Sequence, residues 1–184
     1  KILPKKIIVI WEGGGSPRRR AIFPEYKQKR KPQKLNRFYK DDIPDTVENR
    51  NYQIVLTIEL LRKTPVQQIY ASDCEADDII GFLVKNTFRN EKCIIASSDK
   101  DYYQLINNNV EVWSPGQKKL IKSEDISEKF GFPVYNFCAV RCFCGDSSDG
   151  IPGIKGAGFK SMLKRFPELK EEILSVKQII NLSN

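Results

Sequence analysis

Residues 66–83 read VQQIYASDCEADDIIGFL, and the fold class follows from this stretch. The run 66–71 has the length and apolar content of a short strand. Ser72 and Glu75 have the spacing of a capping box, and the apolar residues that follow recur at helical intervals through about Phe88. A strand that leads directly into a helix is the repeating unit of α/β proteins, so the sequence predicts an α/β fold.

The same alternation extends in both directions along the chain. Further strands are expected at 5–11, 93–97 and 110–113, with a small hairpin at 120–121. Further helices are expected from Asp45 or Thr46 to about Arg62, at 100–106, and from 123 onward with an interruption at 145–158. Such βαβ units are right-handed and predict one mainly parallel sheet in a three-layer α/β/α arrangement.

Acidic residues follow the predicted strands. Glu12 follows the first strand, and two further groups follow the second and third: Asp73, Glu75, Asp77 and Asp78, then Asp99 and Asp101. Because the carboxyl ends of parallel strands meet at one edge, these carboxylates are expected to gather there. A single one could simply cap a helix, as Asp99 could. The whole set exceeds what capping needs, and Asp146 and Asp149 add another pair in a loop.

The chain contains no histidine, which limits its chemistry. A His-based catalytic triad and His-ligated zinc or haem are excluded. Clustered carboxylates need cations to offset their repulsion, and an oxygen-only ligand set favours Mg²⁺ or Mn²⁺. Two such ions beside a basic surface are typical of phosphodiester hydrolysis.

Positive charge is concentrated in one segment. The formal net charge is +8, whereas residues 16–40 alone hold ten Lys/Arg against the single acid Glu25. Such a cluster indicates a polyanionic partner, with nucleic acid the leading candidate. A solvated basic loop is the alternative.

The cysteines favour a reducing compartment. Their number, five, is odd, and the sequence has neither a signal peptide nor a long apolar span, so we expect a cytoplasmic protein without a membrane segment. Cys138, Cys142 and Cys144 lack the paired spacing of a zinc site. We therefore expect them to be buried core thiols.

A glycine-rich turn, GIPGIKGAG at 150–158, separates two helical stretches. Lys155, Lys160 and Lys164 lie in or after it. Glycines permit positive φ and close approach of another backbone, and amides at the start of the next helix can bind phosphate. The turn is either an ordinary helix–helix connection or a hairpin that binds the phosphate backbone of DNA without sequence specificity.

Five strings together resemble the 5′ nucleases related to flap endonucleases, to the 5′-nuclease domain of bacterial DNA polymerase I and to phage 5′→3′ exonucleases. They occur in family order over about residues 6–166, and they are WEGG (11–14), FPEYKQKR (23–30), EADD (75–78), SDKD (98–101) and GDSSDGIPG (145–153). The resemblance implies a PIN-like fold and metal-dependent cleavage of branched DNA or DNA with a 5′ single strand, plus 5′→3′ exonuclease action, in replication or repair.

The resemblance also implies roles for individual residues. The inner metal ligands would be Glu75, Asp77, Asp99 and Asp101, completed by Glu12, Asp78, Asp146 and Asp149. Lys27 and Arg30 would act at the scissile phosphate, and Tyr26 would stack on a base. With the basic segment, the expected DNA-binding set is Arg18, Arg19, Arg20, Tyr26, Lys27, Lys29, Arg30, Lys31, Gly153, Lys155, Gly156, Gly158 and Lys160.

The expected organisation is one compact, monomeric unit. A nuclease core at 1–122 would carry a basic arch at about 16–45, and a helical part at 123–184 would contain a helix–hairpin–helix at about 145–166, where the family often binds K⁺. The family's usual first strand, which carries an Asp, has no counterpart here, so an N-terminal block is expected to be missing. Glu12 stands where the family usually has Asp.

Two other functions remain open from the sequence. The absent Asp block would suit a non-catalytic DNA-binding or scaffolding protein on a degenerate nuclease fold. The same metal chemistry would also suit an RNA-directed 5′ nuclease that acts on RNA–DNA.

Overall fold

The computed structural model describes residues 3–30 and 43–183 of the 184-residue chain. The chain forms two compact units, each assembled from separate stretches of sequence. The first comprises Lys1–Ser16 and Arg30–Ala76, and the second comprises Pro17–Lys29 and Asp77–Asn184. The prediction from the sequence was one compact unit. The boundary expected after residue 122 stays a prediction.

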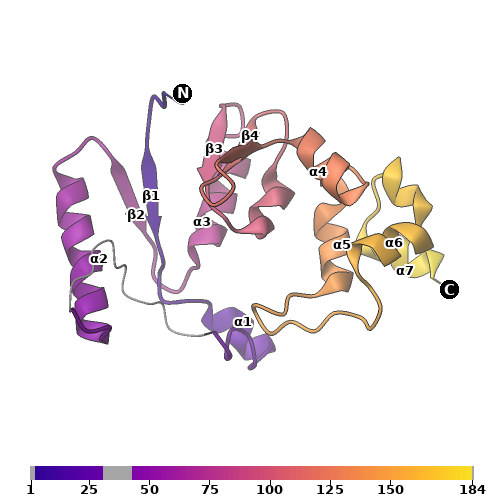
Figure 1. The fold of residues 1–184 in the computed structure, drawn as a ribbon, viewed down its shortest axis with the longest axis horizontal. Helices are drawn as coiled ribbons and strands as arrows, with labels where there is room; N and C mark the ends of the chain where they lie inside the picture. Colours follow the sequence, from indigo (N-terminus) through magenta and orange to yellow (C-terminus); the bar gives the residue numbers. More distant parts are fainter. Residues whose placement is uncertain (1–2, 31–42, 184) are drawn as a thin grey trace. The chain divides into compact units, whose positions relative to one another are not determined.

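The first unit is built on a pair of parallel strands. Strand β1 (Ile8–Trp11) pairs in register with β2 (Gln67–Tyr70), and helix α2 (Val47–Arg62) precedes β2 in the chain (Figure 1). The helix begins after Thr46, whose hydroxyl accepts the N–H of Asn49 at 3.2 Å. The cap predicted at this position is therefore confirmed.

The side chain of Gln68 links three elements of this unit. It donates to the carbonyl of Ile58 in α2 at 3.2 Å and accepts the indole N–H of Trp11 in β1 at 2.9 Å. In contrast, α2 contributes no buried residue within the described chain, and Val55 and Leu60 are each more than half exposed. The apolar spacing thus predicted the helix correctly, but these side chains do not form a core.

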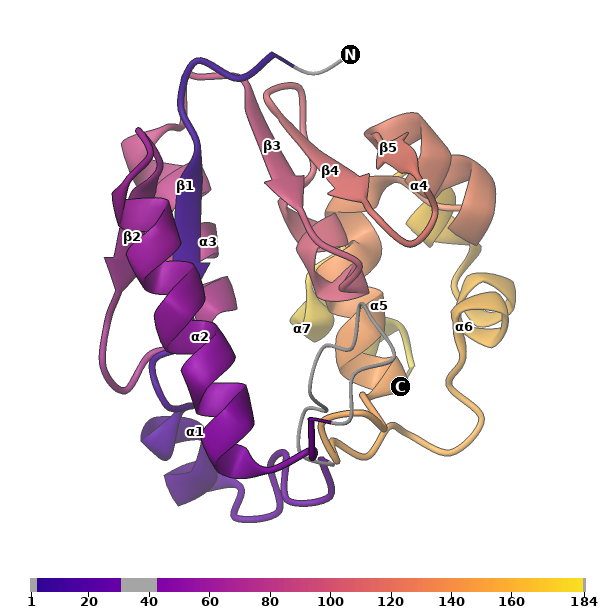
Figure 2. The same cartoon turned by 60° about the vertical axis from the view of Figure 1, so that its left-hand side comes forward.

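The second unit contains a three-stranded mixed sheet (Figure 2). Strand β3 (Cys93–Ala96) runs parallel to β4 (Val110–Ser114), which pairs antiparallel with β5 (Lys119–Ile121). The predicted strand and small hairpin are therefore confirmed. Helical segments of the same unit are α1 (Pro17–Ile22), the π-helical turn η1 (Leu83–Thr87) and the 3₁₀ helix η2 (Lys100–Leu105). Helix α3 (Ala76–Phe82) begins at the last residue of the first unit and otherwise belongs to the second.

The C-terminal part is helical, as the sequence predicts. Its elements are α4 (Ser123–Phe130), η3 (Val134–Asn136), α5 (Phe137–Cys144), α6 (Phe159–Arg165), η4 (Pro167–Lys170) and α7 (Val176–Leu182). Phe130 is central to an aromatic cluster, with ring centroids 5.4 Å from Phe137 and 4.8 Å from Phe159. No helix in 3–30 or 43–183 is long and apolar enough to cross a membrane.

A buried asparagine joins the helices of this part. Asn136 is fully buried, and its amide donates to the carbonyls of Leu169 at 2.9 Å and Glu172 at 2.6 Å. Its carbonyl accepts the N–H of Leu174 at 2.9 Å. One side chain therefore satisfies three backbone groups on the segment around η4, as buried polar groups require.

The α/β class is confirmed, with two corrections of detail. The described residues form two sheets, β1–β2 and β3–β4–β5, rather than one. The helix predicted to begin at Ser72 begins at Ala76, whose N–H donates to the carboxylate of Glu12 at 3.0 Å. The acceptor is remote in sequence, so local capping patterns could not reveal this start.

Candidate active site

The end of β1 lies against the segment that leads into α3. Glu12 accepts the N–H of Ala76, and Gly13 donates its N–H to the carbonyl of Cys74 at 3.1 Å. A Cβ at Gly13 would lie 1.8 Å from the carbonyl oxygen of Ala71, a distance that no side chain tolerates. Glycine therefore permits the close approach that brings Glu12 to the start of α3.

Three carboxylates lie within four consecutive residues at the start of α3. One oxygen from each of Glu75, Asp77 and Asp78 lies within 4.8 Å of the others. Glu75 is buried, whereas Asp78 is exposed. Carboxylates this close repel one another, and a hard divalent cation is the group that oxygen-only donors of this kind suit.

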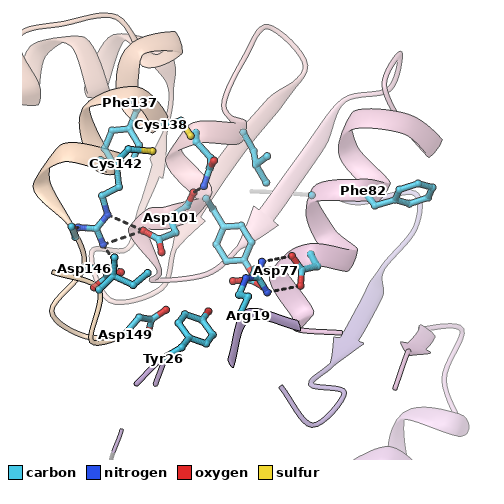
Figure 3. A pocket seen from close by; sticks show the side chains of 18 of the residues that line it. Arg19, Tyr26, Asp77, Phe82, Asp101, Phe137, Cys138, Cys142, Asp146 and Asp149 are labelled. Carbon is cyan, nitrogen blue, oxygen red and sulfur yellow. Dashed lines mark hydrogen bonds and ion pairs between the residues drawn. The ribbon is translucent and has the colours of Figure 1, made fainter. Parts of the chain in front are cut away.

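A pocket of about 780 Å³ lies within the second unit. It is lined by residues of α1, α3, η2 and α5 and of the loop after α5. Figure 3 shows the carboxylates of Asp101, Asp146 and Asp149 gathered in it, near the ring of Tyr26. The aspartates that line the pocket are Asp77, Asp78, Asp101, Asp146 and Asp149.

The guanidinium of Arg141 lies between two of these aspartates. Its Nη2 is 2.6 Å from Asp146 Oδ2 and 3.2 Å from Asp101 Oδ1, and its Nε is 3.3 Å from the same Asp101 oxygen. Its Nη1 donates to the carbonyl of Gly145 at 3.0 Å. The C-terminal end of α5 is thereby tied to η2.

The two aspartates differ in their electrostatic environment. Burial raises the pKa of Asp101 and outweighs the opposing effect of Arg141, while the charges of Asp99 and Asp146 raise it further. Burial also acts to raise the pKa of Asp146, but the hydrogen bonds from Ser148, together with Arg141, hold it below its ordinary value. Asp146 Oδ1 accepts both the N–H of Ser148 at 2.9 Å and its hydroxyl at 2.6 Å.

A second guanidinium reaches the pocket from α1. Arg19 forms a bidentate ion pair with Asp78, in which Nη1 lies 2.8 Å from Oδ2 and Nη2 lies 2.6 Å from Oδ1. Both side chains are 40% exposed. The ring of Tyr26 is buried, and the Arg19 guanidinium lies 5.9 Å from its centroid. Lys27 donates its backbone N–H to the Asp149 carbonyl at 2.8 Å. The pocket therefore combines basic and acidic groups from segments far apart in sequence.

Comparison with known proteins identifies the family. Residues 1–131 match the sequence profile described as 5′-3′ exonuclease, N-terminal resolvase-like domain. The chain belongs to this family. A 5′-3′ exonuclease of Buchnera aphidicola subsp. Schizaphis graminum is 32% identical over 183 residues, which cover 97% of this chain and 59% of that relative. The Flap endonuclease Xni of Shewanella woodyi is 28% identical over 180 residues, covering 96% and 66%.

Solved structures share the fold of this 5′-3′ exonuclease family member. The T5 D15 protein co-crystallised with metal ions superposes with a TM-score of 0.71 at 23% identity, covering 96% of this chain and 64% of that one. The bacteriophage T5 D15 flap endonuclease in a complex with DNA and metal ions gives 0.75 at 22% identity, covering 96% and 63%. The chain thus spans about three-fifths of the length of several proteins that it resembles.

The expected metal ligands of this family member do not all line the pocket. Asp77, Asp78, Asp101, Asp146 and Asp149 line the pocket, whereas Glu12 and Glu75 belong to the first unit. Asp99 is exposed and caps η2, because its Oδ1 accepts the N–H of Asp101 at 2.9 Å. The capping role considered for Asp99 is therefore confirmed, and its role as a ligand stays a prediction.

The expected DNA-binding residues are mostly exposed. Arg19 and Tyr26 line the pocket, and Lys27 is half-buried beside Asp149. Lys31 and the rest of residues 31–42, part of the arch expected at about 16–45, lie outside the described residues. The remaining members are exposed, and they are Arg18, Arg20, Lys29, Arg30, Gly153, Lys155, Gly156, Gly158 and Lys160.

The cysteine prediction is wrong for two residues. Cys138 and Cys142 are exposed and line the pocket, and Cys144 is half-buried. The prediction of core thiols rested on the absence of zinc-site spacing and on the tendency of free cysteines to be buried. The helix buries its other faces, including Phe137 and Val140, so residues spaced four apart at 138 and 142 share the open face.

Sequence reasoning did not single out Arg141. One signal could have found it, because Arg141 is the lone charged residue in the otherwise apolar helix FCAVRCFC. A single charged residue on such a helix needs an oppositely charged partner. Asp146, which follows five residues later in the chain, is a candidate for that partner.

Proposed function

We propose that this chain is the catalytic part of a metal-dependent 5′ nuclease that hydrolyses DNA phosphodiesters, acting as a 5′-flap endonuclease and a 5′→3′ exonuclease. The observation that carries the proposal is the convergence of five aspartates on one pocket that also holds Arg19 and Tyr26. Membership in the 5′-3′ exonuclease family supports it.

The donor set of the pocket suits Mg²⁺ or Mn²⁺. It offers carboxylate oxygens, and the chain has no histidine that would favour a softer ion. We propose two ions, held by aspartates of the pocket, which include Asp77 and Asp78 at the start of α3. When bound, such ions would activate the attacking water and neutralise charge on the departing oxygen.

The protein's own residues would orient the DNA. Lys27, whose Nζ lies 3.9 Å from Asp149 Oδ2, would contact a phosphate that enters the pocket. Arg30 and the exposed Arg18, Arg20 and Lys29 would extend this contact along the backbone of branched or 5′-single-stranded DNA. Tyr26 is buried, so base stacking would require its ring to become accessible.

The connection between α5 and α6 supports a second DNA contact. Gly156 has φ +82°, and the hydroxyl of Ser161 binds the N–H of Gly158 and two nearby carbonyls, so a tight turn precedes α6. Lys155 is exposed at this turn. We propose that the turn is the hairpin of a helix–hairpin–helix, with K⁺ bound at its carbonyls, within a PIN-like three-layer fold.

The direct test is cleavage of a labelled 5′-flap duplex by a full-length preparation, with Mg²⁺, Mn²⁺ and EDTA compared side by side. Cleavage with either ion and none with EDTA is expected. A preparation that binds the flap but leaves it intact with both ions would instead indicate the DNA-binding scaffold. Faster cleavage of RNA–DNA than of DNA–DNA flaps would indicate an RNA-directed nuclease.

Asp99→Asn provides the matched variant. Asparagine caps a helix as well as aspartate does, so η2 is retained while one charge is removed. Cleavage should be abolished, and DNA binding should be retained or tightened because a repulsive charge is gone. Asp125→Asn, the same change on α4 away from the pocket, should cleave normally. Normal cleavage by Asp99→Asn would remove that residue from the catalytic set.

A further inference from the structure

Two cysteines of α5 face the pocket of the second unit. Cys138 and Cys142 are both exposed and both line it, whereas Cys144 on the same helix is half-buried and packs against the hydrophobic core. Free cysteine is among the residue types most often buried, and α5 buries its other faces, which include Phe137 and Val140. Packing therefore does not account for two thiols on the open face of this helix.

Helical spacing places the two thiols next to each other. Residues four apart on an α-helix have Cβ atoms about 5–6 Å apart, and Figure 3 shows both cysteines where α5 borders the pocket. Burial raises the pKa of Cys142, and the charge of Cys138 and a hydrogen bond with its thiol raise it further. Two sulfur ligands of a tetrahedral ion, each about 2.3 Å from the metal, are about 3.8 Å apart. Rotation of the two side chains can bring the sulfur atoms to that separation without moving the helix.

The charge of the pocket favours a cation. Five aspartates line it against three basic side chains, which are Arg19, Lys85 and Arg141. Arg19 and Arg141 are themselves paired with aspartates of the pocket, so their charges are offset. An ion that reaches the thiols therefore enters a region of net negative charge. Carboxylate oxygens prefer hard ions, whereas thiolates select soft or borderline ions such as Cd²⁺ and Zn²⁺, so the two kinds of donor suit different ions.

We propose that Cys138 and Cys142 form a chelating site for a soft or borderline divalent cation of the Zn²⁺ class. This site is separate from the carboxylates that would hold Mg²⁺ or Mn²⁺. Coordination removes the proton from each thiol, and the two thiolates neutralise the charge of the ion. Two cysteine ligands leave the other coordination positions to water, which suits an exchangeable ion rather than a structural one.

The direct test is a titration of the full chain with Cd²⁺, in saturating Mg²⁺ and a non-thiol reductant, followed by the ultraviolet absorption of cadmium–thiolate bonds. This absorption reports sulfur ligands alone, so Cd²⁺ held by carboxylates is not counted. Cys138→Ser and Cys142→Ser should each raise the dissociation constant by about 100-fold, because losing one thiol removes the advantage of two linked ligands. Cys93→Ser is the matched control, since it makes the same change at a half-buried thiol in β3 outside the pocket, and it should bind Cd²⁺ as the unmodified chain does.

Two results would overturn the proposal. One is an absorption that persists unchanged when Cys138 and Cys142 are both replaced by serine in a chain that thermal melting shows to be folded. The other is the absence of this absorption in the reduced, unmodified chain. Both positions are exposed, so the serine variants should fold, and if the double variant does not, the same comparison is made with each single variant.

A consequence for DNA cleavage rests on the function proposed above. An ion at the two thiols, with its bound waters, would take up space in the pocket that a DNA phosphate needs. Cd²⁺ should therefore slow flap cleavage in Mg²⁺ more strongly in the unmodified chain than in the double serine variant, and equal slowing would overturn this consequence. If the unmodified chain does not cleave the flap in Mg²⁺ alone, the proposed nuclease function fails, whereas the Cd²⁺ titration without DNA still decides the thiol site.

Discussion

Gly145→Ala should destabilise the second unit severely, because Gly145 is constrained in two ways. Its backbone has φ 70° and ψ −174°, a region that only glycine adopts readily. An added Cβ would lie 2.3 Å from the backbone nitrogen of Gly153 and 2.7 Å from the carbonyl oxygen of Ile151. Both neighbours are main-chain atoms, so no side chain can rotate away to make room.

The two effects can be given magnitudes. A strained backbone of this kind costs about 1–3 kcal/mol, and overpacking costs about 1–3 kcal/mol more, so we expect a loss near 4 kcal/mol. Gly156 provides the control, because it also has a positive φ of 82° but no described atom within 4 Å of its added Cβ. Gly156→Ala should therefore cost only about 1–2 kcal/mol, the backbone contribution alone.

Urea unfolding followed by circular dichroism measures both losses in the same buffer. The difference between the variants, about 2–3 kcal/mol, isolates the backbone contact across the loop from the strain. Equal losses within about 0.5 kcal/mol would refute the close approach of Gly145 to Gly153. Mn²⁺ binding should also weaken in Gly145→Ala alone, because the same loop holds Asp146 against Arg141.

Other predictions concern stability, pH and salt. Asn136→Ala should cost about 3–5 kcal/mol in urea unfolding, since two buried backbone groups and one part-buried group lose their partner. A loss below about 1 kcal/mol would contradict this. Gly81 lies in α3, and a Cβ added there would have no described atom within 4 Å. Gly81→Ala should therefore raise the free energy of unfolding by about 0.5–1 kcal/mol, because alanine favours a helix more than glycine does. A decrease would show that the added methyl group collides with a neighbouring atom. The hydrogen bond from Lys119 lowers the pKa of Asp125, so this carboxylate stabilises the fold above the ordinary Asp pKa. Asp125→Asn should therefore melt at a lower temperature than the unmodified chain at neutral pH. The two melting temperatures should converge only as the pH falls through the lowered pKa of Asp125, and a difference that persists in stronger acid would contradict the assignment. Lys155→Ala should weaken DNA binding irrespective of sequence and reduce the slope of log affinity against log salt by about one, and an unchanged slope would remove Lys155 from the interface.

Much of the candidate site could be predicted from local patterns. The strands at 93–97 and 110–113, the helix that begins after Thr46 and the cap at Asp99 depend on residues close in sequence, and all four are found. The strings EADD and GDSSDGIPG indicated the family because they preserve residue type and spacing together.

Other features depend on contacts between distant segments. The cap of α3 by Glu12 spans more than sixty residues, and the burial of Asn136 depends on the segment around η4. The exposure of Cys138 and Cys142 depends on which face of α5 packs inward. No local spacing determines any of these, because each is set by which surfaces meet in the folded chain.

The sequence by itself determined the chemistry available to this protein. With no histidine and with acids after successive strands, the sequence favours a hard ion on oxygen ligands beside a basic segment. Only the tertiary structure decided how those acids differ. Arg141 and Ser148 form hydrogen bonds with both oxygens of Asp146, whereas Arg141 contacts one oxygen of Asp101, because a guanidinium on α5 meets a carboxylate on η2 forty residues away.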